Sequence, residues 1–160
     1  MSTLARYRKP GGFKQLLILI ETSTTAKREQ LLKIVGQEDK RWAEELTKRM
    51  ITAQKIFLFP SEAIEKIMQT IPEQTWPKGL FHMNEEERQK LLVALLQFLP
   101  VHKQKAVQDY IATLKPTPGE IEAAHSLMVK KARELQAAGE LKLEKFDASL
   151  VMEGIDRMVI

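Results

Sequence analysis

Three histidines and one acidic run are the side chains in this sequence best suited to chemistry. His82, His102 and His125 are 20 and 23 residues apart, so no two of them form the i, i+4 pair or the HExxH motif of a helical zinc site. The run Glu85–Glu87 is consecutive, and consecutive helical side chains point about 100° apart, so they do not converge on one cation. These carboxylates suit the first turn of a helix instead. We therefore predict no metal site.

Motifs for nucleotide binding and nucleophilic catalysis are also missing. The pair Gly11-Gly12 lacks the Lys-Ser/Thr and the preceding strand of a phosphate-binding loop, and no GxGxxG is present. No serine stands in a nucleophile elbow, and the chain has no cysteine, which excludes thiol catalysis, disulfides and Cys-ligated metals. We expect a protein that is not an enzyme, with no catalytic residues, no cofactor and no small-molecule substrate.

The charge of the chain is unevenly distributed. Its 160 residues carry 25 basic and 21 acidic side chains, and the excess lies up to Lys55, where 12 basic residues meet 6 acidic ones. A basic segment invites a nucleic-acid interpretation. However, acidic residues are interspersed among the basic ones and no aromatic RNA-binding motif accompanies them, which favours a solvated helix surface. We expect no nucleic-acid partner and keep binding by this basic third as the last of three hypotheses.

The apolar runs are short. The longest, Leu16–Ile20 and Leu91–Leu96, fall far below the ~20 residues that span a bilayer. The basic N-terminus is followed by too short an apolar stretch, and then by Glu21, for a secretory signal. We expect a cytoplasmic location.

Apolar residues recur at helical spacing along most of the chain, which predicts an all-α protein. Asp39, Asn84 with Glu87, and Thr117 with Glu120 are predicted helix starts, while Gly36 and Gly139 are predicted helix ends. The segment Ile56–Phe59, closed by Pro60, suits a buried connector or a short strand, and Ser61 suits a cap. We expect helices over about 13–20, 25–35, 40–53, 61–71, 84–98, 100–114 and 118–138.

Several motifs follow one another in the order found in one known family. At the N-terminal end, Lys9–Gly12 opens an apolar helix, and Trp42–Leu46 leads to Lys48–Met50 and then to Ala63–Met68. Toward the other end come Ala106–Tyr110, Gly119–Ala124 and Ala132–Glu140. From about Lys9 to Leu143, the sequence resembles the C-terminal half of the flagellar motor switch protein FliG, as a divergent or truncated member without the N-terminal and middle domains.

The resemblance implies a superhelical fold in which an armadillo-like three-helix unit precedes a small helical subdomain. We accordingly expect an armadillo-like unit over 1–55, an apolar connector over 56–60, a stator-facing subdomain over 61–145, and a C-terminal apolar tail over 146–160. This tail is apolar enough to dock on the body of the protein or on another chain.

The resemblance also implies a non-enzymatic part of the rotor, peripheral to the inner membrane at the flagellar basal body. Its implied partners are stator and switch-complex proteins, with self-association in a ring. The stator-facing helix corresponds to about Pro100–Leu114. The residues implied to face the partner are His102, Lys103, Lys105, Asp109 and Tyr110.

This sequence departs from the family on that helix and at the hinge. Of the family's charges only Asp109 is clearly retained, because His102 stands for a basic residue and Tyr110 for an acidic one. The family's Met-Phe-x-Phe hinge reads Met50-Ile51-Thr52-Ala53, with aromatic residues displaced to Phe57 and Phe59. The resemblance therefore implies Met50, Ile51, Phe57 and Phe59 as inter-domain residues.

Two further interpretations stay open. The charges of helix 100–114 either face a partner or only solvate an outer helix. Alternatively, the chain is a FliG-like adaptor or regulatory protein that binds a different protein through apolar surface near Ile51 and Phe57–Phe59, or through its tail.

Overall fold

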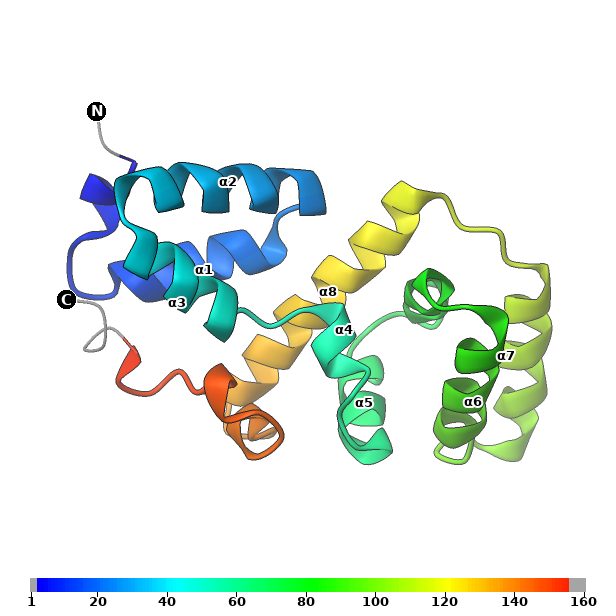
Figure 1. The fold of residues 1–160 in the computed structure, drawn as a ribbon. Coiled ribbons are helices and arrows are strands. Elements are labelled where there is room, and N and C mark those ends of the chain that lie inside the picture. The colour runs from blue at the N-terminus through cyan, green and yellow to red at the C-terminus, as the bar shows by residue number, and fades with distance from the viewer. Residues whose placement is uncertain (1–2, 156–160) are drawn as a thin grey trace. The chain divides into compact units, whose positions relative to one another are not determined.

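The computed structural model describes residues 3–155, and every regular element within that range is a helix, which confirms the all-α prediction. Four short 3₁₀ helices accompany the α-helices: η1 (Leu4–Tyr7), η2 (Trp76–His82), η3 (Leu143–Lys145) and η4 (Ala148–Leu150). The α-helices are α1 (Gly12–Thr22), α2 (Thr25–Glu38), α3 (Lys40–Arg49), α4 (Ala53–Ile56), α5 (Ser61–Met68), α6 (Glu85–Leu96), α7 (Val101–Thr113) and α8 (Pro118–Ala137) (Figure 1). No helix of the described residues is long and apolar enough to cross a membrane.

The chain divides into two compact units. Unit 1 contains the residues up to Thr52 together with those from Lys142 onward, and unit 2 is Ala53–Leu141. The backbone thus passes from one unit to the other twice, once between Thr52 and Ala53 and once between Leu141 and Lys142. Of the tail expected over 146–160, residues 156–160 lie outside the described residues.

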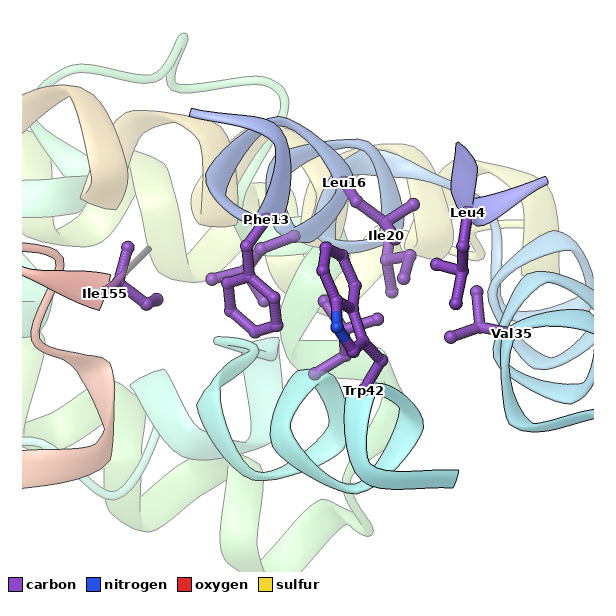
Figure 2. Packing of buried hydrophobic residues seen from close by; sticks show 9 residues of the cluster. Leu4, Phe13, Leu16, Ile20, Val35, Trp42 and Ile155 are labelled. Carbon is purple, nitrogen blue, oxygen red and sulfur yellow. The ribbon is translucent and has the colours of Figure 1, made fainter. Parts of the chain in front are cut away.

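Unit 1 is built around α1, α2 and α3, which pack against one another in sequence order. Figure 2 shows the rings of Phe13 and Trp42 in its core, and their centroids lie 5.3 Å apart in an edge-to-face arrangement. Ile155 joins this core from the C-terminal segment. The fully packed cluster consists of Leu4, Phe13, Leu16, Leu17, Ile20, Val35, Trp42, Leu46 and Ile155.

The first helix begins at a glycine pair for two different reasons. Gly11 has a φ of 81°, a left-handed conformation that glycine adopts without strain. Gly12 is required by packing, because a Cβ at this position would lie 1.7 Å from the carbonyl oxygen of Tyr7. The pair therefore lets η1 turn back closely onto the start of α1.

Asp39 and Thr24 cap helices of unit 1. The Asp39 side chain accepts hydrogen bonds from the backbone N–H groups of Arg41 and Trp42, which confirms the predicted start of α3. Thr24 accepts from Lys27 at the start of α2. Both side chains satisfy donors that have no partner within the helix.

Two helix ends predicted in unit 1 are wrong. Helix α2 continues through Gly36 to Glu38, because Gly36 keeps a right-handed conformation and the Glu38 carboxylate accepts from the backbone N–H groups of Thr3 and Leu4 at 2.7 and 2.8 Å. Helix α3 ends at Arg49 rather than near Ala53, because Met50 turns to extended backbone.

Unit 2 contains α4 to α8 with η2. Helix α5 packs against α6 and α8, and η2 lies along α8, where Gly79 allows close approach. A Cβ on Gly79 would come within 3.2 Å of Met128 Sδ and 3.3 Å of the His125 ring. The fully buried side chains of this unit include Ile56, Ile64, Ile67, Leu80 and Met128.

The predicted helix starts of unit 2 are confirmed in two of three places. Thr117 and Glu120 form a complete capping box with Pro118 in the first turn of α8, and Gly139 follows the helix with a φ of 74°. Asn84 accepts from the Glu87 N–H at the start of α6. Ser61 makes no side-chain cap, because Pro60 occupies the cap position of α5.

The segment Ile56–Phe59 is a helical turn, so the alternative of a strand is wrong. Phe57 and Phe59 donate backbone hydrogen bonds to Ala53 and Ile56. This turn directs Ile56 and Phe59 inward, while Leu58 remains 86% exposed, so the segment is buried only in part. Ile56 and Phe59 are three residues apart and so lie on the same side of the turn, whereas Leu58 lies on another side.

Candidate functional site

Helix α7 is the element that the sequence implied as partner-facing. Its two buried side chains, Val107 and Ile111, are four residues apart and fix one face of the helix against unit 2. Pro100 precedes the helix with a φ of −56° and so sets its first turn. Most of the exposed residues of α7 are polar, although Val101 at its start is 82% exposed.

Two of the five implied residues contact the neighbouring loop of unit 2. Lys103 Nζ lies 3.3 Å from Glu73 Oε1 in an ion pair, and the Tyr110 hydroxyl donates to the carbonyl oxygen of Gln74 at 2.9 Å. Lys103 and Tyr110 are seven residues apart and therefore lie on the same side of α7. Both contacts position α7 against this loop. The Lys103 ammonium and the Tyr110 hydroxyl therefore already have partners within unit 2.

The other three implied residues are exposed and share one face. His102, Lys105 and Asp109 are spaced by three and four residues, which places them on one stripe of the helix. We call this stripe the α7 charged face. It carries a basic residue, an acidic residue and an imidazole, and it can make hydrogen bonds and ion pairs with a partner surface.

An ion pair joins η2 to the first turn of α8. Lys78 Nζ lies 2.9 Å from Glu120 Oε2. Hydrogen bonds from the Lys78 ammonium and then from the Thr117 backbone lower the pKa of Glu120. The same bond to Glu120 raises the pKa of Lys78. Glu120 therefore caps α8 and ties it to η2.

The implied hinge residues Met50 and Ile51 belong to unit 1. Ile51 is fully buried, and its backbone N–H donates to the buried carboxylate of Glu21 at 2.8 Å. Met50 is half-buried and packs against the unit 1 core. The extended residues before α4 are therefore anchored to unit 1.

Phe57 and Phe59 belong to unit 2. The Phe57 ring stacks on His82 with centroids 5.0 Å apart, and His82 and His125 lie edge to face at 4.8 Å. Both imidazoles point a nitrogen at the Gly79 carbonyl oxygen, at 2.9 and 2.8 Å. A carbonyl oxygen only accepts, so both of these nitrogens carry a hydrogen.

This histidine cluster was not predicted from the sequence. His82 and His125 are 43 residues apart, and η2 and α8 must pack before their rings meet. Each ring uses one nitrogen on Gly79, and residues 3–155 contain no group of three or more His, Asp or Glu side chains arranged as metal ligands. The cluster stabilises the packing of η2 on α8.

Comparison with protein families decides which class the chain belongs to. The family described as the FliG C-terminal domain matches residues 14–143 of the 160. The chain belongs to the FliG C-terminal domain family. This match runs from the third residue of α1 to beyond α8 and so includes both the α7 charged face and the non-helical residues before α4.

Membership of the FliG family makes this chain a flagellar motor switch or rotor component of a non-catalytic class. The family is associated with the flagellar basal body and with the switch complex. Neither the curated proteins nor the solved structures contain a significant match to the chain. The segment after residue 143 lies outside the FliG match.

Proposed function

We propose that this protein acts in the rotor through the α7 charged face, which contacts the charged cytoplasmic part of the stator. The observation that carries the proposal is a difference between two sides of α7: Lys103 and Tyr110 contact Glu73 and Gln74 of unit 2, while Lys105 and Asp109 are exposed on the α7 charged face. Such a face takes part in torque generation or switching by contact and without bond chemistry. In the competing interpretation these charges only solvate the helix, and reversing them leaves stator binding unchanged.

The energy of each contact is small. An exposed ion pair contributes about 0–1 kcal/mol, which corresponds to at most roughly a fivefold change in affinity. A ring of many copies adds such contributions together, and we therefore include self-association in a ring within the proposal. The location that follows is the cytoplasmic face of the inner membrane, at the basal body.

Binding measurements with single charge reversals test the stator contact. The probe is the purified cytoplasmic segment of the stator from the same cell, titrated against the full chain at low and at physiological salt. We expect Lys105→Glu and Asp109→Lys each to change Kd by roughly two- to fivefold, more at low salt. Lys115→Glu, an exposed reversal just beyond α7, is the matched control and should leave Kd unchanged. Equal Kd values for all four proteins contradict the proposal.

A second function, as an adaptor for a different protein, is favoured by one surface of unit 2. Leu58 is 86% exposed and borders a groove that Phe57, Phe59, Leu91 and Ala94 help to line. Exposed apolar side chains beside a groove are typical of contacts with another protein. Ile51, by contrast, is fully buried and takes no part in such a surface.

The two functions respond to different substitutions. If the adaptor role is the true one, the native chain captures from a flagellated cell a protein outside the stator and the switch complex, Leu58→Asp abolishes that capture, and Lys105→Glu leaves it unchanged. If the stator contact is the true one, Lys105→Glu reduces stator binding and Leu58→Asp does not.

A further inference from the structure

The C-terminal segment returns to unit 1 after leaving α8. Gly139, with a φ of 74°, ends the helix, and the backbone N–H groups of Glu140 and Leu141 donate to the carbonyl oxygen of Leu135. Leu141 is still part of unit 2, whereas Lys142 and the residues after it belong to unit 1. We call Lys142–Ile155 the strap.

The strap is an ordered part of unit 1. Leu143 and Leu150 are fully buried and Ile155 is 2% exposed. The side chain of Asp147 accepts hydrogen bonds from the backbone and the hydroxyl of Ser149, which fixes the start of η4. Helix η4 packs against α3.

Ile155 completes the core of unit 1. It lies in one cluster with Phe13 and Trp42, and Figure 2 shows it beside Phe13. Met152 packs against the same cluster. Burial of several apolar side chains over so short a segment is the main force that keeps the strap in place.

The two crossings between the units are therefore both anchored on unit 1. At the first, Ile51 is buried and bound to Glu21 just before the chain enters unit 2. At the second, the strap begins at Lys142 and is held on unit 1 by the packing of η4 against α3 and by Ile155 in the unit 1 core. A unit joined to another by one short link can swing about it, whereas two short anchored links restrict that swing.

We propose that the strap is a second tether, which restricts the movement of unit 2 about the non-helical residues Met50–Thr52. The strap lies almost wholly beyond residue 143, where the FliG match ends. Release of the strap from unit 1 frees unit 2, and with it the α7 charged face, to move independently.

Distance measurements between spin labels test this tether. The chain has no cysteine, so Lys33→Cys on α2 and Lys130→Cys on α8, both exposed, give specific labels on unit 1 and unit 2. The decisive variant places a Gly/Ser insertion of about 12 residues between Leu141 and Lys142, with an r.m.s. span of roughly 20 Å. The strap then keeps its sequence and its docking site on unit 1, but the link between the strap and unit 2 is longer.

The expected result is a narrow distance distribution for the native chain and a distribution at least about twice as wide for the insertion variant. The same insertion between Lys115 and Pro116, inside unit 2, is the matched control and should keep the native width. A broad distribution in the native chain, or an unchanged width after the insertion at Leu141, overturns the proposal.

A second pair of variants undocks the strap without changing its length. Leu150→Asp places a charge at a buried position and should broaden the distribution, while Ala148→Asp, at an exposed position of the same turn, should not. If Leu150→Asp unfolds unit 1, the insertion variant still decides the question, because it removes no buried side chain.

Discussion

The Glu21 carboxylate and the Ile51 backbone N–H, 30 residues apart in sequence, lie 2.8 Å apart in the interior of unit 1. Glu21 is only 1% exposed. This hydrogen bond joins the last turn of α1 to the extended backbone that leads into unit 2. Because the donor is buried, leaving it without an acceptor costs more than breaking an ordinary surface hydrogen bond.

Replacing Glu21 should therefore destabilise unit 1. We expect Glu21→Ala to lower the free energy of unfolding by about 1.5–3 kcal/mol, because the buried N–H of Ile51 loses its acceptor. Glu21→Gln keeps an acceptor oxygen and should cost less. Urea denaturation of the full chain measures both, and Glu29→Ala, an exposed glutamate on α2, is the control that should change stability by less than about 0.5 kcal/mol. An equal loss for Glu21→Ala and Glu29→Ala contradicts this account of the link.

Two glycines of unit 1 should respond to alanine in opposite directions. Gly12→Ala should destabilise the protein strongly, because the new Cβ would lie 1.7 Å from the backbone oxygen of Tyr7. Gly36→Ala should stabilise it by about 0.5–1 kcal/mol, because Gly36 lies inside α2 and its Cβ would meet only Ala43 Cβ, at an ordinary 3.5 Å. Thermal melting of the two variants gives the signs directly. Destabilisation by Gly36→Ala would mean that the helix requires glycine there.

The starts of α3, α6 and α8 were predictable from the sequence because their signals are local, whereas the predicted Ser61 cap of α5 is not made. The Thr117–Glu120 capping box and the Asp39 cap each involve groups within three residues of one another, so the sequence alone contains the whole interaction. The end of α2 was not predictable from Gly36. It depends on the contact between Glu38 and the N-terminal residues Thr3 and Leu4, more than 30 positions away.

The candidate site was predictable only in part. The resemblance pointed to α7, but the sequence did not show that Tyr110 binds the Gln74 carbonyl while Lys105 and Asp109 stay exposed. Helical periodicity gives the face of a residue, whereas its neighbour is set by packing between helices. The link between Glu21 and Ile51 was missed for the same reason.

Tyr110→Phe separates the positioning role from the contact role on α7. Loss of the hydroxyl removes the hydrogen bond to Gln74 and should cost about 0.5–1.5 kcal/mol of stability. Because the α7 charged face is untouched, stator binding should stay at the native level. A drop in binding as large as that of Lys105→Glu would show that Tyr110 itself contacts the partner.

The stability of the protein should fall in acid. Hydrogen bonding by the Arg8 guanidinium, together with the backbone of Trp42 and Arg41, lowers the pKa of Asp39. A carboxyl whose pKa is lowered on folding contributes stability above its unfolded pKa, about 4, and this contribution is lost as the pH falls through the folded pKa. Glu120, whose pKa is lowered mainly by Lys78, acts in the same direction.

Urea midpoints measured between about pH 5 and pH 2 check this linkage. The native chain should lose stability toward the acid end, and Asp39→Asn should show a shallower decline because one linked carboxyl is gone. Arg8→Gln should also make the loss of stability with falling pH shallower, because it removes the hydrogen bond that contributes most to the lowered pKa of Asp39. Identical curves for all three proteins would rule out this role for the pair.

The swimming of cells is the most direct test of the central claim, that the α7 charged face acts on the stator. Cells of the source organism whose only copy is Asp109→Lys should make the protein at normal levels, assemble flagella and swim more slowly than cells with the native chain. Cells with Lys115→Glu should swim normally. Native speed in Asp109→Lys and in Lys105→Glu cells would contradict the claim.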